Sequence, residues 1–281
     1  MPANLPHLIR FAVPAIALLM AMPLQAAVIP YTNNFSGTGG NVDFPHENAG
    51  SGQSWEVIGG EYRLRGTVTS GGQISTSAVQ PITNAGSVAA FTMETKFRLP
   101  GSPAIPNGAN FVGLAAFGLS SGMEGAGAST AFYLADWRFG ANSSTDVGQV
   151  RILSLGDTLG FAGTTGTVDD FTGTGGGNWA AQADTVYTLR LTATVTGGTL
   201  SMSFGVFDAA GTTQIGTSAT GTDTSPLTGE YFGLRSRIGS GGQPQDLLFD
   251  DFSIIPEPGS LALAAVAGAC LLGRRRGGRA G

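Results

Sequence analysis

The stretch Tyr187-Thr-Leu-Arg-Leu-Thr-Ala-Thr-Val-Thr-Gly-Gly-Thr-Leu-Ser-Met-Ser-Phe-Gly-Val206 decides the fold class. Apolar and polar residues alternate on both sides of Gly197-Gly198. Alternation with a period of two is typical of a strand with one buried face, and a Gly-Gly pair suits a tight turn between two strands. The stretch therefore predicts an antiparallel β-hairpin.

The same alternation recurs in residues 91–99, Phe-Thr-Met-Glu-Thr-Lys-Phe-Arg-Leu. One face of this strand is apolar, and the other carries Glu94, Lys96 and Arg98, which we interpret as solvated charge. Weaker patterns of the same kind predict further strands at residues 55–58, 61–66, 110–119, 130–139, 148–155, 230–237 and 246–255.

Composition supports an all-β chain. Glycine accounts for 45 of 281 residues, and no segment keeps the 3.6-residue period of a helix. Many short strands separated by glycine-rich turns predict a two-sheet antiparallel jelly-roll sandwich. The Gly/Thr-rich residues 156–178 are expected to form a long loop.

The strand pattern resembles the concanavalin A-like and laminin-G-like jelly rolls. Residues 91–99 followed by Phe111-Val-Gly-Leu-Ala-Ala-Phe117 are similar to the central strands of that superfamily. Leu247-Leu-Phe-Asp-Asp-Phe-Ser-Ile254 resembles the last strand of many carbohydrate-binding sandwiches. In those proteins a paired aspartate often helps to hold a structural calcium ion.

Residues 1–27 follow the pattern of a secretory signal peptide. Arg10 precedes an apolar run from Phe11 to Met22, and the small residues Ala26 and Ala27 offer a cleavage point for signal peptidase. A twelve-residue helix spans only about 18 Å, too short for a permanent anchor in about 30 Å of hydrocarbon. We therefore expect a folded domain at residues 28–255.

Residues 256–281 have three parts in order: a Pro-Glu-Pro tripeptide, an apolar stretch at 261–272 and an arginine cluster. The residues that define the ends of this tail are Pro256, Glu257, Pro258, Arg274, Arg275 and Arg276. The arginines favour the cytoplasmic side of the membrane. The tail resembles the PEP-CTERM sorting signal. That resemblance implies transient membrane contact, processing by an exosortase and delivery to the surface or extracellular matrix, often alongside exopolysaccharide production.

Charge and rare residues exclude several function classes. Residues 28–255 carry 9 basic against 18 acidic side chains, a net charge of −9 that disfavours nucleic acid. The single cysteine, Cys270, permits no intramolecular disulfide and no thiolate zinc site. His46 is the one histidine after residue 27, and we expect it in an exposed loop and not in a catalytic triad.

Catalytic carboxylates are not evident. Glycoside hydrolysis needs two of them about 5 to 9 Å apart, and no strand carries them at alternating positions. Glu94 stands alone, and Asp136 shares its strand face with Arg138. We predict that the chain is not an enzyme, with a polysaccharide hydrolase or lyase as one alternative.

Candidate ligand-binding residues are aromatic or acidic. Trp179, Trp137 and Tyr133 could stack on sugar rings, although core packing also explains the last two. Asp250 and Asp251 are candidate calcium ligands, with Asp250 expected on the apolar face of its strand. The alternative partner is one of the arginines Arg63, Arg65, Arg235 and Arg237.

These observations together predict an exported, non-enzymatic surface or matrix protein. It would be sorted through its terminal segment and associated with polysaccharide. A calcium-dependent, lectin-like module is the second alternative. No cofactor other than calcium is suggested.

Overall fold

The computed structural model describes residues 29–36, 44–48, 53–66, 74–83, 88–101, 111–123, 127–138, 148–156, 160–167, 181–238 and 245–257. Residues 1–27, which the sequence predicts to be a signal peptide, lie outside these residues, as do Trp179, Pro258 and the arginines 274–276. None of the described residues belongs to a helix long and apolar enough to cross a membrane.

The described chain is almost entirely β-structure. One short 3-10 helix, Ala128–Thr130, interrupts the strands. The strands are β1 Tyr31–Asn33, β2 His46–Asn48, β3 Gln53–Ile58, β4 Glu61–Gly66, β5 Ile74–Pro81, β6 Ala90–Arg98, β7 Phe111–Gly118, β8 Phe132–Arg138, β9 Gln149–Leu155, β10 Phe161–Gly163, β11 Thr165–Thr167, β12 Tyr187–Thr196, β13 Thr199–Phe207, β14 Gln214–Asp223, β15 Tyr231–Ile238 and β16 Gln245–Pro256.

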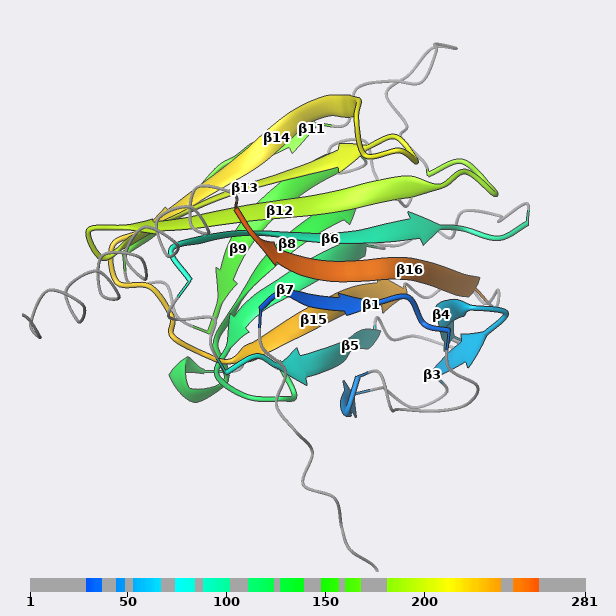
Figure 1. Cartoon of the computed structure of the whole chain (residues 1–281), viewed down its shortest axis with the longest axis horizontal. Helices are drawn as coiled ribbons and strands as arrows, with labels where there is room; N and C mark the ends of the chain where they lie inside the picture. The colour runs from blue at the N-terminus through cyan, green and yellow to red at the C-terminus, as the bar shows by residue number, and fades with distance from the viewer. Residues whose placement is uncertain are drawn as a thin grey trace, which may run out of the picture.

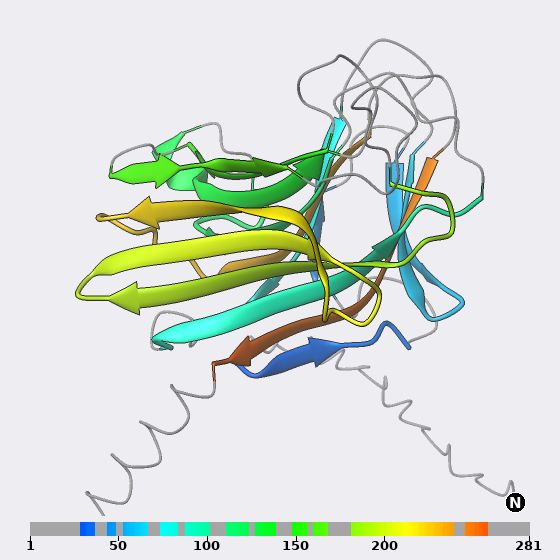
Figure 2. The same ribbon diagram turned by 90° about the horizontal axis from the view of Figure 1, so that it is seen from above.

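These strands pair into two antiparallel sheets that face each other (Figures 1 and 2). The nine-stranded sheet has the order β10-β14-β13-β12-β6-β16-β4-β3, with β1 paired to β16. The seven-stranded sheet has the order β11-β9-β8-β7-β15-β5-β2. The two-sheet antiparallel sandwich predicted from the alternation is therefore confirmed.

The hairpin that decided the fold class forms between β12 and β13. Thr196 pairs with Thr199, and Gly197 and Gly198 make the turn with φ of 59° and 84°. Two consecutive positive φ values match the right-handed twist of the strands, and glycine adopts them without steric cost. The prediction of this hairpin is confirmed.

The core lies between the sheets. Alternate residues of β6 are buried, as its sequence predicted. Phe97 makes an edge contact with Trp137 of the opposite sheet at 6.1 Å between ring centroids, and Phe91 makes a similar contact with Phe232 at 5.8 Å. Large aromatic side chains from both inner faces therefore close the sandwich.

The structure contains strands that the sequence pattern did not indicate. β5 and β14 are full strands, and the short strands β10 and β11 lie within the stretch expected to be a loop. β10 and β11 pair with β14 and β9, at the edges of the two sheets. β11 and β14 are rich in glycine and threonine and β10 has only three residues, so backbone pairing with a neighbouring strand places these three strands and side-chain alternation does not reveal them.

The last strand differs from its prediction in two ways. A β-bulge lies between Asp250 and Ser253, where Asp251 has a φ of 48°. In addition, β16 continues to Pro256, which lies opposite Phe91, and the Glu257 amide donates a hydrogen bond to the Ala90 carbonyl at 3.0 Å. Proline is tolerated at the end of a strand because no further ladder bond requires its missing N–H.

Candidate functional site: a polar groove beside the bulge of β16

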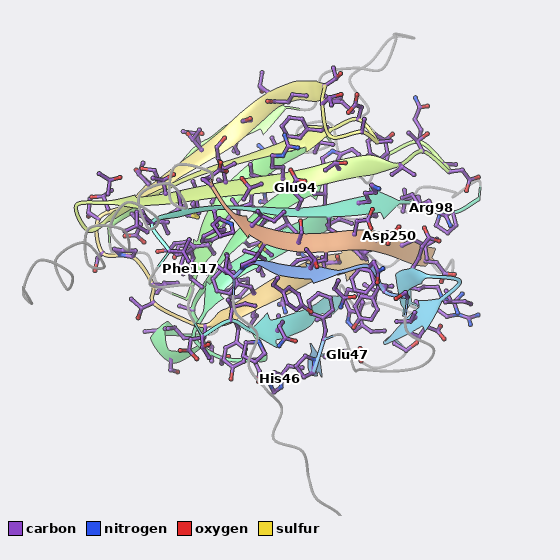
Figure 3. All side chains as sticks on the ribbon, in the orientation of Figure 1. His46, Glu47, Glu94, Arg98, Phe117 and Asp250 are labelled. Atoms are coloured by element: carbon purple, nitrogen blue, oxygen red, sulfur yellow. The ribbon has the colours of Figure 1, made fainter. Side chains whose placement is uncertain are left out.

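Two adjoining hollows follow the outer face of the nine-stranded sheet beside the bulge. Their volumes are about 420 Å³ and 290 Å³, and they share Lys96 and Ala209. We call them together the bulge groove. Its polar lining includes Asn33, Glu94, Lys96, Thr188, Asp250 and Asp251. Figure 3 shows Glu94 and Arg98 on β6 close to Asp250 on β16.

Asp250 faces outward just before the bulge, which corrects the prediction that it lies on the apolar face. Asp250 lies opposite Lys96, while Phe249 lies opposite Phe97 in the core. One extra residue at Asp251 then restores the inward direction for the apolar residues that follow. The buried Thr95 hydroxyl donates to the Asp250 carbonyl at 3.0 Å and so holds the bulge in place.

The two aspartates differ in their partners. The Lys96 ammonium lies 2.5 Å from the Asp251 carboxylate, and that hydrogen bond is the main cause of the raised Lys96 pKa. Asp250 accepts a hydrogen bond from the Asp251 amide at 2.8 Å. Burial, opposed by that bond, raises the pKa of the Asp250 carboxyl.

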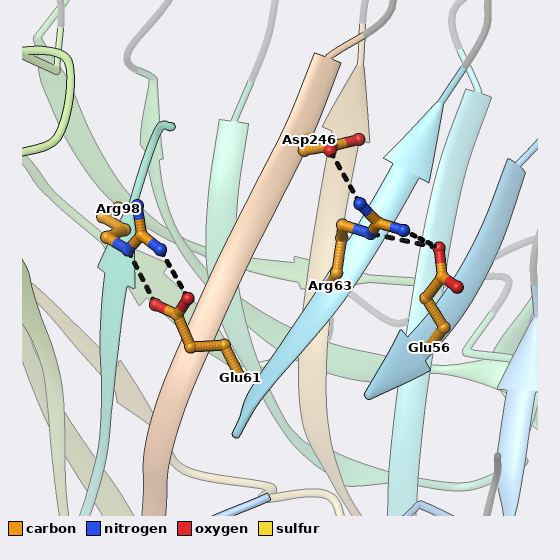
Figure 4. A network of polar contacts seen from close by, with 5 residues as sticks. All are labelled: Glu56, Glu61, Arg63, Arg98 and Asp246. Carbon is orange, nitrogen blue, oxygen red and sulfur yellow. Dashed lines mark hydrogen bonds and ion pairs between the residues drawn. The ribbon is translucent and has the colours of Figure 1, made fainter. Parts of the chain in front are cut away.

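These contacts do not fit a preformed calcium site. Calcium prefers six to eight oxygen ligands, and the described residues contain no group of three histidine, cysteine or acidic side chains suited to a metal. The sequence interpretation expected calcium to supply the positive charge beside Asp251, and in the structure Lys96 supplies it. In the part of the chain that the structure describes, the ion pairs and hydrogen bonds of Asp250 and Asp251 do not include the four arginines proposed as alternative partners. Arg63, for example, pairs with Glu56 and Asp246 (Figure 4).

The remaining ionic groups of the bulge groove are paired across strands. Glu94 of β6 accepts a hydrogen bond from Arg190 of β12, whose guanidinium also lies 4.3 Å from the centroid of the Phe207 ring. Glu61 of β4 makes a two-bond contact with Arg98 of β6, at 2.7 Å and 2.5 Å (Figure 4). The interpretation of β6 as carrying mere solvated charge missed this arrangement, because the partners come from distant parts of the chain.

The bulge groove is therefore a hydrogen-bonding surface with little unbalanced charge. Hydroxyl, amide and ion-paired groups line it, and they can both donate to and accept from a hydroxyl-rich ligand. Asp250 is the acid of the groove without an ion pair at hydrogen-bond distance among the described contacts. It is the group best placed to accept from a bound hydroxyl.

The aromatic candidates Trp137 and Tyr133 lie inside the sandwich. Their side chains are 0% and 1% exposed. Trp137 packs against Tyr187, and the Tyr133 hydroxyl donates to Asp223 at 2.6 Å. Neither ring presents a face to solvent, so core packing, the competing interpretation, accounts for both. Trp179 lies outside the described residues.

His46 is in a strand, and not in a loop as expected. It belongs to β2 (Figure 3), and its ring contacts Tyr231 edge-on, with 5.6 Å between the ring centroids. The neighbouring Glu47 accepts a hydrogen bond from Tyr62, and burial raises the pKa of the Glu47 carboxyl. Among the described contacts of His46 there is no serine or carboxylate arranged as in a catalytic triad.

No protein-family model matches this chain, and no curated protein is similar to it. Among solved structures, peanut lectin in complex with a peptide has a TM-score of 0.44 at 13% identity, covering 82% of this chain and 98% of that chain. Lectin I of Ulex europaeus, bound to a methyl fucoside, has a TM-score of 0.45 at 15% identity, covering 80% and 98%. A structure from work on endo-acting O-glycanases of the human gut microbiota has a TM-score of 0.45 at 12% identity, covering 82% and 100%. Likeness at this level carries no ligand or activity to this chain, and the sandwich assignment stands on the strand pairing itself.

Proposed function

We propose that this chain is an exported surface or extracellular-matrix protein whose sandwich is a non-enzymatic module that contacts polysaccharide through the bulge groove. The observation that carries the binding part is the groove itself: two adjoining hollows on the face of the nine-stranded sheet, lined by both polar and apolar groups, with most of the ionic groups paired. Such a surface suits an uncharged, hydroxyl-rich ligand, because most of its charges are already paired and a ligand hydroxyl can donate to Asp250, the acid without an ion pair.

Export and sorting are proposed from the terminal segments. A short apolar run with small residues at 26–27 precedes the domain, and the Pro-Glu-Pro tripeptide, apolar stretch and arginine cluster follow it. Glu257 is held at the end of the domain by the hydrogen bond from its amide to the Ala90 carbonyl and by a hydrogen bond from the Thr92 hydroxyl to its carboxylate. The tripeptide would thus start at the folded edge, with signal peptidase and an exosortase as the processing partners.

The binding proposal is tested with neutral polysaccharides in affinity electrophoresis. Asp250→Asn and Thr188→Val change the wall of the groove, and Arg65→Gln is the control, since Arg65 is exposed on β4 outside the lining of either hollow. We expect the two groove variants to lose retardation while the control keeps it. Equal retardation of all the variants, or no retardation of the unmodified protein by any neutral polymer, would contradict the proposal.

The sorting proposal is tested by replacing Pro256, Glu257 and Pro258 with alanine in the native host. We expect the replacement to block maturation, so that an uncleaved, membrane-associated form accumulates. Processing that continues unchanged would remove the sorting signal from the account.

A polysaccharide hydrolase or lyase is the second candidate, favoured by one observation. The pKa of Asp250 is raised, mainly by burial, and it lies in a groove wall beside Asp251. A carboxyl with a raised pKa is suited to general acid catalysis. Release of reducing ends from polysaccharide that stops in Asp250→Asn would establish this function and replace the non-enzymatic one.

A further inference from the structure

A leucine interrupts the acidic outer row of β16 at one end of the bulge groove. The outward residues of this strand before the bulge are Asp246, Leu248 and Asp250, whereas Leu247 and Phe249 belong to the core between the sheets. Leu248 lies outside the core clusters of the described residues, yet it is only 5% exposed. Its apolar side chain is therefore buried on the outer face of the nine-stranded sheet.

Arginines that are already paired flank Leu248. It lies opposite Arg98 of β6 and Arg63 of β4, and Figure 4 shows these two arginines on either side of β16. Arg98 pairs with Glu61, and Arg63 pairs with Asp246 at 3.2 Å. The apolar stems of long cationic side chains can cover an apolar neighbour while their charged ends stay in water. An uncharged group can therefore pack beside Leu248 without desolvating an unpaired charge.

Leu248 lines the smaller hollow of the bulge groove, of about 290 Å³, which we call the Leu248 hollow. Val186, which precedes β12, and Ala209, which lies between β13 and β14, also line it. Val186 is partly exposed and Ala209 is exposed, so this apolar wall is open to solvent. The volume is close to the lower end of the roughly 300–1,000 Å³ that small-molecule sites occupy, which suits a single sugar residue.

An acceptor lies beside this apolar wall. Asp250 lines the same hollow, two residues along β16 from Leu248 and so roughly 7 Å away on a strand. Its carboxylate can accept a hydrogen bond from a ligand hydroxyl, and it disfavours a ligand carboxylate by like charge. The hollow therefore suits a neutral ligand with an apolar group at one end and a hydroxyl at the other.

A methyl group suits the apolar end better than the hydroxymethyl group of an ordinary hexose. The two cations that line the hollow, Lys96 and Arg98, are engaged by Asp251 and Glu61. A hydroxyl placed against Leu248 would exchange water for an apolar contact, whereas a methyl group gains from the same burial.

We propose that the Leu248 hollow is a subsite for a 6-deoxyhexose residue of a neutral polysaccharide, with the methyl group against Leu248 and Val186 and a ring hydroxyl on Asp250. This inference rests on the proposed polysaccharide contact through the bulge groove and names the kind of sugar that the groove selects.

The test is saturation-transfer difference NMR with matched pairs of methyl glycosides. The probes are methyl α-L-rhamnoside with methyl α-L-mannoside, and methyl α-L-fucoside with methyl α-L-galactoside, because the members of each pair differ only in the hydroxyl on C6. Titration of each glycoside gives its affinity, and the saturation of each proton shows which part of the sugar lies against the protein.

Three variants assign the effect to the hollow. Val186→Thr keeps the shape of the wall and adds a hydroxyl, and Leu248→Asn makes the floor polar. The matched control is Val195→Thr, since Val195 is 38% exposed on β12 and lies outside the lining of either hollow. Near-UV circular dichroism checks folding, and Val186→Thr carries the test if the buried Leu248→Asn does not fold.

We expect the 6-deoxyhexoside of at least one pair to bind the unmodified protein about fivefold or more tightly than its hexoside, with the strongest saturation on its C6 methyl protons. Val186→Thr should reduce this preference to within about twofold, and Val195→Thr should keep it. Equal affinity within both pairs, a preference that survives in Val186→Thr, or one lost equally in Val195→Thr would overturn the inference.

Two further outcomes separate this inference from the proposed function. If none of the glycosides binds while a neutral polysaccharide still retards the protein in affinity electrophoresis, the 6-deoxyhexose subsite is wrong and the polysaccharide contact stands. If no neutral polymer retards the protein and no glycoside binds, both fail.

Discussion

Removing Arg151 should expose the cost of the buried carboxylate of Asp136. The Asp136 side chain is completely buried and Arg151 is 15% exposed, so water can reach the guanidinium but not the carboxylate. Breaking a buried ion pair by deleting one partner typically costs about 3–5 kcal/mol. We expect Arg151→Met to lose this amount of unfolding free energy at pH 7, a fall in Tm of roughly 6–20 °C for a domain of this size.

The pH dependence gives the sharper signature. Without Arg151, burial is opposed only by the charge of Arg138, so the folded-state pKa of Asp136 rises further above the ordinary 3.8. The folded state then binds a proton that the unfolded state does not, so the unfolding free energy rises as pH falls through the folded-state pKa. The deficit of Arg151→Met relative to the unmodified protein should therefore shrink at acidic pH.

Companion variants separate charge from packing. Asp136→Asn leaves only the partly exposed guanidinium without its partner, so a smaller and nearly pH-independent loss is expected. The double variant Asp136→Leu/Arg151→Met removes both charges and should recover most of the stability. Urea denaturation from pH 4 to pH 8 measures all four proteins. The control Arg65→Gln changes an exposed site and should lower the unfolding free energy by no more than about 0.5 kcal/mol. The reasoning would be refuted if Arg151→Met lost no more than this control, or if its loss of unfolding free energy did not vary with pH.

Three further predictions concern the turn, the edge and the bulge. Replacing Gly197 or Gly198 with alanine should lower the unfolding free energy by about 1–2 kcal/mol each, because both have positive φ. The control Gly127→Ala should change it by less than about 0.5 kcal/mol, because Gly127 is extended and an added Cβ would meet open space. Similar costs at all three positions in urea denaturation would contradict the turn assignment. Burial raises the Glu47 pKa above 4.5, so the folded state binds the extra proton and stability should rise as pH falls through the folded-state pKa. Glu47→Gln should remove that part of the slope, and identical pH profiles for the two proteins would argue against it. Because Lys96 already neutralises Asp251, chelation with EDTA should leave the Tm of the unmodified protein unchanged. Lys96→Met should lower the unfolding free energy by less than about 1 kcal/mol, and added calcium should stabilise this variant. A Tm of the unmodified protein that falls on chelation would instead restore calcium to the bulge.

The strands that could be predicted are those whose side chains report one buried face. β6 and the β12–β13 hairpin alternate apolar and polar residues over their whole length, and both form as expected. β14 and β10 could not be recognised in the same way. The glycine and threonine residues of β14 fit solvent and sheet alike, β10 has only three residues, and the two strands pair with each other although they lie far apart in the sequence.

The candidate site was less predictable than the fold, for two physical reasons. A bulge inserts one residue and reverses the face to which the following residues point. Alternation counted back from the residues after the bulge therefore places Asp250 inside, whereas it lies outside. The ion pairs Glu94–Arg190 and Glu61–Arg98 join segments far apart in the chain, and only the sheet order brings them together.

The intact mass of the mature polypeptide, taken together with its location, tests the central claim most directly. Cells of the native host would be separated into cytosol, membrane and surface or medium fractions, and the protein in each would be weighed by mass spectrometry. The account predicts a surface or medium form shorter than the 28.5 kDa chain of 281 residues, lacking about the first 27 residues and the segment after the Pro-Glu-Pro tripeptide. A full-length chain of 281 residues free in the cytosol would contradict it.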